Sequence, residues 1–219
     1  GKEHWIKYNV FGTRTGRLTT KRGSFPILTL DKTWRTVIQP KKDWLIELDF
    51  NAAELRTLTA LNGLQQPQED IHEWNIKNVY RGAGTREEAK RIFSWLYNPA
   101  SEDKLSSQIY NRDAILDKFF DGTHVTNPFG RVMPSDKEHA LNYTIQSTTS
   151  DVVLRQMIKV FDFLKEKDSN LLFCLHDSIV LDMTDEDCKN NLRHIVKMFG
   201  DTQLGNFLVN VRVGKNYGE

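Results

Sequence analysis

The sequence predicts an α+β protein in which a sheet is covered by helices on one face. Two stretches rich in apolar residues have the length and composition of strands, DWLIELDF at 43–50 and LLFCLHDSIVLDM at 171–183. Apolar residues at helical spacing mark two amphipathic helices, at 150–165 and 188–199. Because helices and strands do not alternate regularly, the α+β class fits better than a parallel α/β fold.

The composition is that of a globular protein. The 219 residues, 39% hydrophobic and 27% charged, are enough for one large domain or two small ones. The 30 Lys and Arg residues nearly balance 29 Asp and Glu residues, so the net charge of +1 does not by itself indicate nucleic acid. The segment from Lys2 to Arg35 is rich in Lys and Arg, which indicates either a phosphate-binding arm or an ordinary solvated surface.

The cysteine content and the hydropathy narrow the cellular context. Cys174 and Cys188 are too few for a disulfide framework, so we expect free thiols and a reducing compartment. No apolar stretch approaches the roughly 18 residues of a membrane span. The start, GKEHWIKYNV, lacks the pattern of a signal peptide. We therefore expect no membrane partner.

The N-terminal quarter of the chain is expected to lead into a strand and a helix. The first 40 residues contain several Gly and Pro residues and predict loops with short strands. The strand at 43–50 is followed by AAELRTLTAL at 52–61, which favours a helix, with Asn51 as its cap. Asp49 therefore lies where a strand meets a helix.

Two helices are expected in the next segment. The first is a short helix at 71–80 between loop-like stretches. The second spans 85–97, where Thr85 and Glu88 have the spacing of a capping box. Asn98-Pro99 is expected to end this helix.

The remaining elements are a further helical stretch, a hairpin and a final strand. The charged stretch at 102–120 is helical in pattern, and THVTNPFGRVMP at 123–134 predicts a hairpin. The tail FLVNVRV at 207–213 predicts a half-buried strand whose apolar face consists of alternate residues, Phe207, Val209, Val211 and Val213.

The triplet His176-Asp177-Ser178 separates two apolar runs, where a carboxylate is costly unless it lies at a turn or beside a cation. We expect a hairpin with Asp177 at its tip. If this hairpin neighbours the strand at 43–50, Asp49 and Asp177 meet at one edge of a sheet, where repulsion would keep one of them protonated. Divalent cations remove that conflict, and oxygen ligands suit Mg²⁺ or Mn²⁺ rather than zinc. The pattern indicates two-metal phosphoryl transfer, with ordinary turn residues as the alternative.

Several motifs occur in an order that resembles the signatures of family A DNA polymerases, the family of bacterial DNA polymerase I and many phage replicases. In chain order these motifs are TGRLTT (15–20), LDFNAAELR (48–56), DIH (70–72), REEAKRIFSWLYN (86–98), FGRVMP (129–134), NYTIQSTTSDVVLRQM (142–157), LHDSIVL (175–181) and the ending LVNVRVGKNYGE. Each motif alone is weakly specific, but together they cover nearly the whole chain.

The resemblance implies a right-hand polymerase fold. The palm, an antiparallel sheet backed by helices, is expected from 1–60 and 123–219, and a reduced helical fingers subdomain from 61–122. The family's thumb and 3′-5′ exonuclease precede the TGRL motif, and only 14 residues precede Thr15, so we expect neither in this chain. The fingers are short, because 25 residues separate Tyr97 from Thr123.

The resemblance also implies template-directed DNA synthesis, in which dNMP passes from dNTP to a primer 3′-hydroxyl with release of pyrophosphate. Asp49 and Asp177 match the two metal-binding aspartates, and the backbone carbonyl of Phe50 completes the shell of two Mg²⁺ ions, for which Mn²⁺ can substitute. The implied partners are primer–template DNA, dNTP and a separate thumb or processivity partner. The implied location is the cytoplasm of a bacterial or phage-infected cell, with an organellar matrix as the alternative.

Six residues match nucleotide-binding positions of the family, namely Glu54, His72, Arg86, Lys90, Phe93 and Tyr97. The resemblance makes Glu54 a steric gate against a ribose 2′-hydroxyl, hydrogen-bonded to Tyr97, and brings His72 near the incoming phosphates. The spacing independently puts a cationic and aromatic set on one face of the helix at 85–97, consisting of Arg86, Lys90, Phe93 and Tyr97. The family spacing from Lys to the aromatic residue is one residue longer. Either a residue is missing inside this helix, or Ala89 takes the Lys position.

Four residues match DNA-contacting positions of the family. Arg17 would reach the minor groove at the primer terminus, and His176 would lie near a primer phosphate. Asn142 and Gln146, one helical turn apart, would lie near the insertion site. Amides can bond the minor-groove acceptors common to all base pairs, which reports correct pairing without reading sequence. Alone, each of these residues is equally consistent with a surface or capping role.

One departure from the family and two alternatives remain. Many members have His-Asp-Glu where this chain has Ser178, which implies one fewer outer-shell metal contact. The His-Asp-Ser triplet also resembles single-subunit RNA polymerases, an alternative that Glu54 opposes because the gate excludes ribonucleotides. The other alternative is a non-catalytic DNA-binding replisome module, which the intact Asp49 and Asp177 oppose.

Overall fold

The computed structural model describes residues 5–98 and 100–218, which form two compact units. Unit 1 contains the described residues of Gly1–Phe50, Ser150–Thr202 and Val209–Glu219, and unit 2 contains those of Asn51–Thr149 and Gln203–Leu208. The expected helix end at Pro99 lies outside the described residues.

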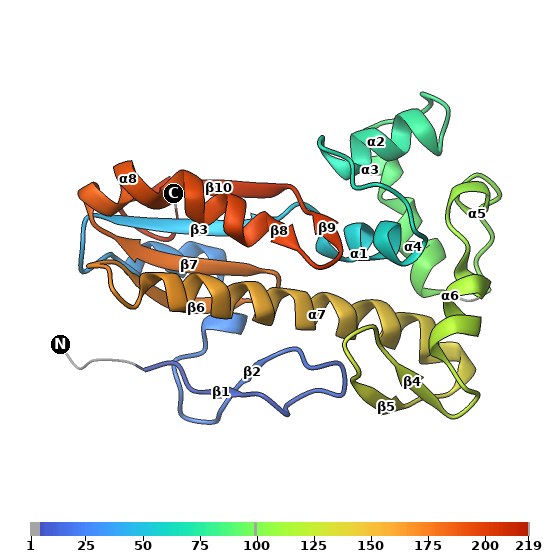
Figure 1. Cartoon of the computed structure of the whole chain (residues 1–219), viewed down its shortest axis with the longest axis horizontal. Helices are drawn as coiled ribbons and strands as arrows, with labels where there is room; N and C mark the ends of the chain where they lie inside the picture. Colours follow the sequence, from blue (N-terminus) through green and yellow to red (C-terminus); the bar gives the residue numbers. More distant parts are fainter. Residues whose placement is uncertain (1–4, 99, 219) are drawn as a thin grey trace. The chain divides into compact units, whose positions relative to one another are not determined.

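Unit 1 is built on a four-stranded antiparallel sheet, whose strands lie one above another in Figure 1. The strands, in sheet order, are β10 (Val209–Gly214), β3 (Trp44–Phe50), β7 (Ser178–Met183) and β6 (Asn170–Leu175). Strands β6 and β7 form the predicted hairpin, with a register shift between Leu171 and Phe173. The α+β class and the antiparallel sheet are therefore as predicted.

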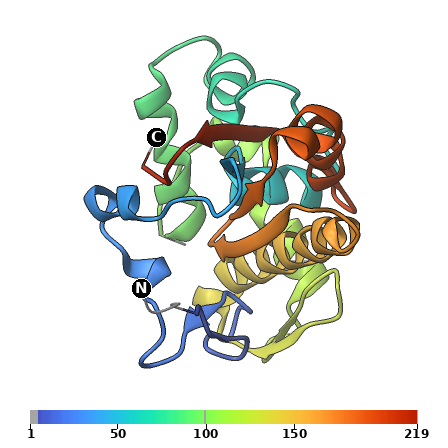
Figure 2. The same ribbon diagram turned by 90° about the vertical axis from the view of Figure 1, so that its left-hand side faces the viewer.

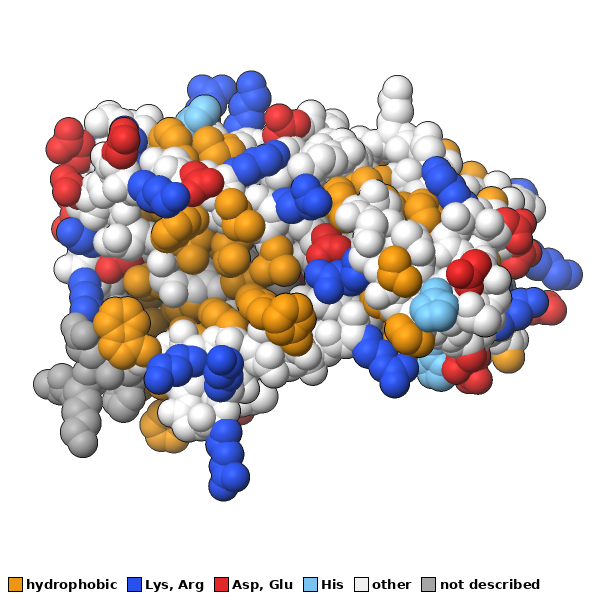
Figure 3. All heavy atoms as spheres, turned by 60° about the horizontal axis from the view of Figure 1, so that its bottom comes forward, with side chains coloured by type: hydrophobic (Ala, Val, Ile, Leu, Met, Phe, Trp, Pro, Cys, Tyr) orange, Lys and Arg blue, Asp and Glu red, His pale blue; other side chains and the backbone are white. Residues whose placement is uncertain are grey.

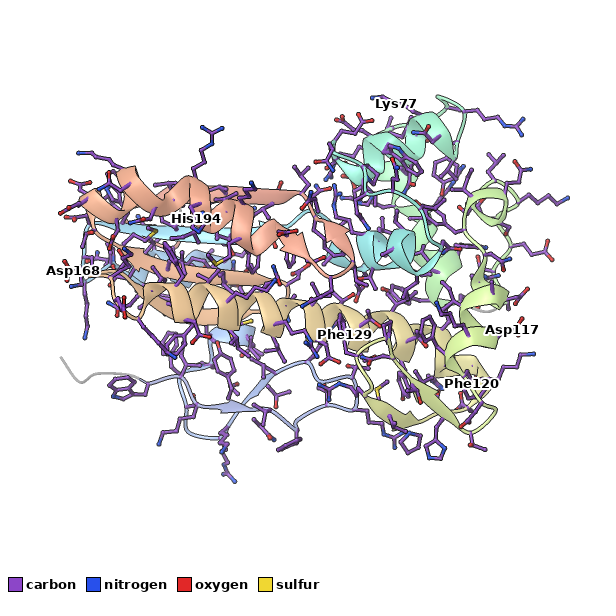
Figure 4. The ribbon with its side chains drawn as sticks, in the orientation of Figure 1. Lys77, Asp117, Phe120, Phe129, Asp168 and His194 are labelled. Carbon is purple, nitrogen blue, oxygen red and sulfur yellow. The ribbon has the colours of Figure 1, made fainter. Side chains whose placement is uncertain are left out.

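The alternation of side chains along β3 separates the two faces of this sheet. One face carries Ile46, Leu48 and Phe50, and helix α8 (Asp185–Gly200) covers it, because Phe50 stacks on Phe199 with ring centroids 4.3 Å apart. The later part of α7 (Lys137–Leu164) lies beside α8 on the same side (Figure 2). His194 of α8, labelled in Figure 4, contacts the ring of Phe163 with centroids 5.1 Å apart. Helices thus cover one face, as predicted.

The N-terminal segment covers the opposite face of the sheet (Figure 2). It contains only short elements, β1 (Tyr8–Asn9), β2 (Thr19–Thr20), η1 (Ile27–Thr29) and η2 (Lys32–Val37). Together with the strands and the C-terminal tail it buries a small core of Ile27, Leu45, Phe173, Leu175, Val180 and Tyr217. The predicted loops and short strands are confirmed.

The final strand is less buried than its pattern predicts. Val211 and Val213 of β10 are 41% and 47% exposed. The prediction of a half-buried strand was wrong because β10 lies at the edge of the sheet, with a neighbouring strand on one side only.

Further large apolar side chains of unit 1 are exposed, among them Ile158 and Phe161 of α7. Figure 3 shows hydrophobic side chains gathered over this part of the surface, with Lys and Arg side chains around them.

Unit 2 is mainly helical. Its helices are α1 (Ala53–Leu61), α2 (Ile71–Asn78), α3 (Arg86–Ala89), α4 (Arg91–Tyr97), α5 (Ser106–Ile109), α6 (Arg112–Phe119) and the first turns of α7. The predicted hairpin is formed by β4 (His124–Thr126) and β5 (Val132–Pro134), and a bridge links Phe120, labelled in Figure 4, to Val125. Two short strands, β8 (Asp201–Thr202) and β9 (Gly205–Asn206), lie between α8 and β10 in the sequence.

Two predicted helices are each divided in two. The helix expected at 85–97 breaks at Lys90, whose N–H bonds the carbonyls of Glu87 and Glu88, and Phe93 N–H in turn bonds the carbonyl of Lys90. This tight turn lets both Ala89 and Ile92 be buried in the core. The stretch at 102–120 breaks at Tyr110, whose buried hydroxyl donates to Asn75 at 2.7 Å.

Helix α7 is longer than its predicted range of 150–165. It begins at Lys137 and runs for 28 residues. Its first half carries buried hydroxyl side chains at Thr144, Thr148 and Thr149, each bonded to a carbonyl four residues earlier. These polar residues hide the helical periodicity in the sequence. Among the described helices, none has the combination of length and apolar character that crossing a membrane requires.

Candidate active site

Two carboxylates meet at one end of the sheet in unit 1. Asp49, the penultimate residue of β3, is paired in register with Ser178, the first residue of β7. Asp177 directly precedes Ser178, and its carbonyl accepts a bond from Phe50 N–H at 3.4 Å. The expectation that the two strands are neighbours is confirmed.

A two-residue turn presents Asp177. Leu175 and Ser178 are paired across the hairpin, so His176 and Asp177 form the turn. His176 has a φ of 54°, in the left-handed region that few residues other than glycine adopt. Strain of this kind persists only where the surrounding structure imposes it, and here the buried strands on both sides do so. Asp177 is thus both a turn residue and a neighbour of another acid.

The electrostatics of Asp49 reflect this proximity. Burial raises its pKa to about 6, with further contributions from the charges of Asp177 and Glu47, while a hydrogen bond from Asn210 and the charge of Arg212 oppose the rise. Two acids in this arrangement suit a divalent cation, which favours the ionised form of both. Within the described residues, no three His, Cys, Asp or Glu side chains converge on a single metal position. Water and substrate oxygens would therefore have to complete the shell of an Mg²⁺ ion.

A buried network beside Asp49 was not predicted. Glu47 lies two residues before Asp49 on the same strand face and accepts hydrogen bonds from Ser178 Oγ at 3.1 Å and Tyr217 Oη at 3.0 Å. Arg212 lies opposite Glu47 in the sheet and pairs with it at 3.3 Å. The sequence could have indicated that Glu47 lies beside Asp49. In the strand WLIELDF the two acids are two residues apart, and side chains at that spacing point to the same face.

Two predicted DNA-contacting residues lie together in unit 1. Arg17 and His176 line one small groove, whose floor includes Leu18, Ser150 and Cys174. His176 is exposed there because the hairpin turn projects it outward. The TGRL motif and the hairpin thus contribute to one surface.

In unit 2 the predicted partners Glu54 and Tyr97 are joined. The Tyr97 hydroxyl donates to the Glu54 carboxylate. Glu54 lies in the first turn of α1, where the helix dipole favours an acid. The predicted cap Asn51 does not cap this helix, since the N-cap is Ala52 with a φ of 50° and no side-chain cap bond.

The remaining predicted nucleotide-binding residues continue from Tyr97 in a row. Phe93 stacks against Tyr97 with ring centroids 6.2 Å apart, and His72 lies 5.9 Å from Phe93. Burial lowers the pKa of His72, and its electrostatic neighbours include Arg86 and Lys90. The Nδ1 atom of His72 is buried without a hydrogen-bond partner in the described part of the chain. The six predicted residues therefore form one cluster, despite the break at Lys90.

Both cations of this cluster hold acidic partners. Arg86 pairs with Asp70 at 3.0 Å, and Lys90 pairs with Glu87 at 2.7 Å. Burial alone would raise the pKa of Asp70, but hydrogen bonds from Arg86 and Asn51 lower it to about 2. Ala89, the residue that was considered for the family's Lys position, is buried.

Arg56, which belongs to the LDFNAAELR motif, organises the segment beneath this cluster. Its guanidinium is fully buried and bonds the carbonyls of Asn51, Pro67 and Glu69 at 2.7 to 2.8 Å. The Asn51 side chain accepts from Arg56 and donates to Asp70 at 2.9 Å. Burial lowers the pKa of Arg56 to about 10. These bonds fix the loop that leads to Asp70, the N-cap of α2, whose first turn carries His72.

The other two predicted DNA-contacting residues lie on α7 within unit 2. Asn142 and Gln146 are half-buried and one turn apart. Asn142 lines a pocket with Tyr97, Arg112, Lys137 and Leu141. Its Oδ1 atom is buried without a hydrogen-bond partner in the described part of the chain. An acceptor of this kind is suited to a ligand that brings a donor.

The antiparallel sheet and the paired acids agree with the class of protein that the sequence resembles, the DNA polymerases. Comparison with known proteins shows the family. Residues 87–219 match the family described as DNA polymerase family A. The chain is 26% identical to the thermostable DNA polymerase I of Thermus thermophilus over 83% of its length and 27% identical to the DNA polymerase of Mycobacterium phage L5 over 94%. This chain belongs to DNA polymerase family A.

A solved structure shares the fold. The POL domain of Pol1 from M. smegmatis, in complex with DNA primer-template and dNTP, matches 97% of this chain with a TM-score of 0.78 and 16% identity. The chain spans 48% of that protein and 28% and 40% of the Thermus and phage L5 relatives. The match therefore supports the fold, and the chain spans less than half of the length of these relatives.

Proposed function

We propose that this chain carries out template-directed DNA synthesis, transferring dNMP from dNTP to a primer 3′-hydroxyl. The observation that carries the proposal is the pairing of Asp49 and Asp177 at adjoining ends of β3 and β7, where burial and repulsion raise the pKa of Asp49 to about 6. Membership of DNA polymerase family A supports the same chemistry.

In the proposed reaction the primer 3′-oxygen attacks the α-phosphorus of the dNTP. The bond from that phosphorus to the bridging oxygen breaks, and pyrophosphate leaves. Asp49, Asp177 and the carbonyl of Phe50 are the groups that would hold two Mg²⁺ or Mn²⁺ ions. Ions bound there would lower the pKa of the primer 3′-hydroxyl and neutralise the charge of the leaving pyrophosphate.

We assign nucleotide binding to the cluster in unit 2. Arg86, Lys90 and His72 suit the phosphates, because both cations lie at the surface and the pair of Lys90 with the exposed Glu87 can be replaced by a triphosphate at little cost. The rings of Phe93 and Tyr97 suit the base. Glu54, held by the Tyr97 hydroxyl, is proposed to exclude the ribose 2′-hydroxyl.

We propose that primer–template DNA contacts Arg17 and His176 of unit 1 and Asn142 and Gln146 of unit 2. The predicted subdivision stays a proposal as well: a palm from 1–60 and 123–219, and reduced fingers from 61–122. A separate thumb or processivity partner is part of the same proposal.

Primer extension tests this function. The chain is incubated with a primed template of defined sequence, Mg²⁺ and one nucleotide at a time, either dNTP or rNTP. We expect template-directed addition of dNMP, and loss of that addition in Asp49→Asn and Asp177→Asn. A preference for rNTP would favour the RNA polymerase alternative. DNA binding without extension, under conditions in which both variants bind DNA like the wild type, would favour the non-catalytic module.

A further inference from the structure

Glu47 is a buried acid that the proposed chemistry does not use. It is 8% exposed and lies in the middle of β3 among apolar neighbours. A carboxylate at such a depth is unfavourable unless several donors satisfy it. Donors converge on it from two other strands and from the C-terminal tail: Ser178 of β7, Arg212 of β10 and Tyr217.

These donors fix the position of Glu47 without removing its charge. Ser178 and Tyr217 are hydroxyl groups, and both bond the Oε1 atom. Its cationic partner among the described residues, Arg212, bonds Oε2 at 3.3 Å from a side chain that is 65% exposed. Attraction between an exposed guanidinium and a carboxylate is strongly screened by water. A negative charge therefore persists at a fixed point in the sheet.

This charge faces the paired acids. Side chains two residues apart on a strand point to the same face and lie about 7 Å apart. Glu47 is thus a near neighbour of Asp49, while Ser178, which holds it, directly follows Asp177. Since no three acids converge on one metal position within the described residues, Glu47 acts on a cation through space or through water.

We infer that Glu47 is a positioning residue of the metal site, whose fixed carboxylate raises the affinity of Asp49 and Asp177 for divalent cations. The inference rests on the proposed function. It also gives a role to Ser178, which stands where many members of the family have Glu. The hairpin lacks a second carboxylate after Asp177, and its serine instead holds a carboxylate that the neighbouring strand supplies.

The test is a titration of the full chain with Mn²⁺ alone, with free Mn²⁺ measured by electron paramagnetic resonance. Glu47→Gln keeps the shape and one acceptor oxygen but removes the charge. We expect its dissociation constant for Mn²⁺ to rise at least about tenfold, because one charge at about 7 Å from a divalent ion has nearly that effect even with the screening of bulk water.

Asp182→Asn is the matched control. Asp182 is a buried acid on the same sheet face, opposite Leu45, and it accepts bonds from the N–H groups of Lys41 and Lys42 at 3.0 Å. It lies about 13 Å along the strands from the level of Asp49. We expect the control to lower the free energy of unfolding but to bind Mn²⁺ like the wild type. Equal Mn²⁺ affinity in Glu47→Gln and Asp182→Asn overturns the inference.

Two further variants make the result decisive. If Glu47→Gln fails to fold, Glu47→Met decides, because it also removes the charge while its unbranched side chain of similar size suits the apolar neighbours, and Mn²⁺ binding like that of the wild type contradicts the inference. Asp49→Asn separates the two proposals. If the wild type binds no more Mn²⁺ than Asp49→Asn, the proposed function fails. If the wild type binds more and Glu47→Gln equals it, only the role of Glu47 fails.

Discussion

At the scale of single residues, the environment of a side chain decides what its chemistry can be. Asp49 and Glu47 lie on one strand and one face, yet Asp49 faces a second acid while Glu47 faces three donors. Glu54 in unit 2 differs again, because its carboxylate accepts a hydrogen bond from the phenol of Tyr97. Three acids within eight residues therefore have three different environments.

Sugar selection is expected to depend on Glu54. Glu54→Ala removes the carboxylate that is proposed to fill the space of a 2′-hydroxyl, so the ratio of rNTP to dNTP incorporation should rise at least about tenfold. Tyr97→Phe keeps the ring but releases the carboxylate, and a smaller rise is expected. Single-nucleotide primer extension with each substrate measures both ratios. An unchanged ratio in Glu54→Ala would refute the gate.

The raised pKa of Asp49 predicts a pH dependence of stability. Its folded pKa of about 6 exceeds its unfolded value of about 4, so the folded state holds a proton more tightly. This site therefore destabilises the metal-free protein as pH rises from about 4 to about 6, and the full effect persists above about 6. Urea unfolding in EDTA should show Asp49→Asn to be more stable than the wild type above pH about 6. The difference should vanish below pH about 4, and excess Mg²⁺ should reduce it at high pH.

At the scale of elements, long apolar patterns were easy to interpret and local bonding was not. Strands β3, β6 and β7 and helix α8 follow from their periodicity. The breaks at Lys90 and Tyr110 do not, because they depend on which side chains the core of unit 2 must accept. The start of α7 was missed because its buried threonines bond their own helix and resemble surface residues in the sequence.

The loop between α1 and α2 is expected to depend on Arg56. Arg56→Lys keeps the charge but cannot reach all the carbonyl groups of Asn51, Pro67 and Glu69, which would lose their donors in a buried site. We expect a loss of about 2–4 kcal/mol in the free energy of unfolding, measured with urea. The control Lys77→Gln breaks an exposed pair with Glu69 and should cost less than about 1 kcal/mol. Equal losses in the two variants would contradict the anchoring role.

At the scale of the whole molecule, a net charge of +1 means that affinity for DNA has to come from local groups of cations. The N-terminal segment is one such group, with Arg14, Arg17, Lys21 and Arg22 within a few residues of the groove that contains His176. The segment can be a phosphate-binding arm or a solvated surface, and the salt dependence of DNA binding distinguishes these two interpretations.

The affinity for primer–template DNA is therefore expected to fall steeply with salt. If three phosphates are neutralised, the association constant should drop about 40-fold between about 50 and 200 mM salt. Fluorescence anisotropy with a labelled primer–template in EDTA measures the slope, and Arg17→Ala should make it shallower by about one unit. Asp49→Asn should leave the slope unchanged. A salt-independent affinity would exclude the phosphate-binding arm.

The sequence by itself determined the class of fold, the hairpin and the acid at its tip, because these depend on periodicity and on residue types that few other arrangements tolerate. It also predicted the members of the cluster proposed to bind nucleotide, in which the rings of His72, Phe93 and Tyr97 and the carboxylate of Glu54 meet within unit 2. Only the tertiary structure decided that Glu47 is held by Ser178, Tyr217 and Arg212, since these residues lie 131, 170 and 165 positions away along the chain. Contacts of that range arise from strand pairing and register, which no local pattern in the sequence encodes.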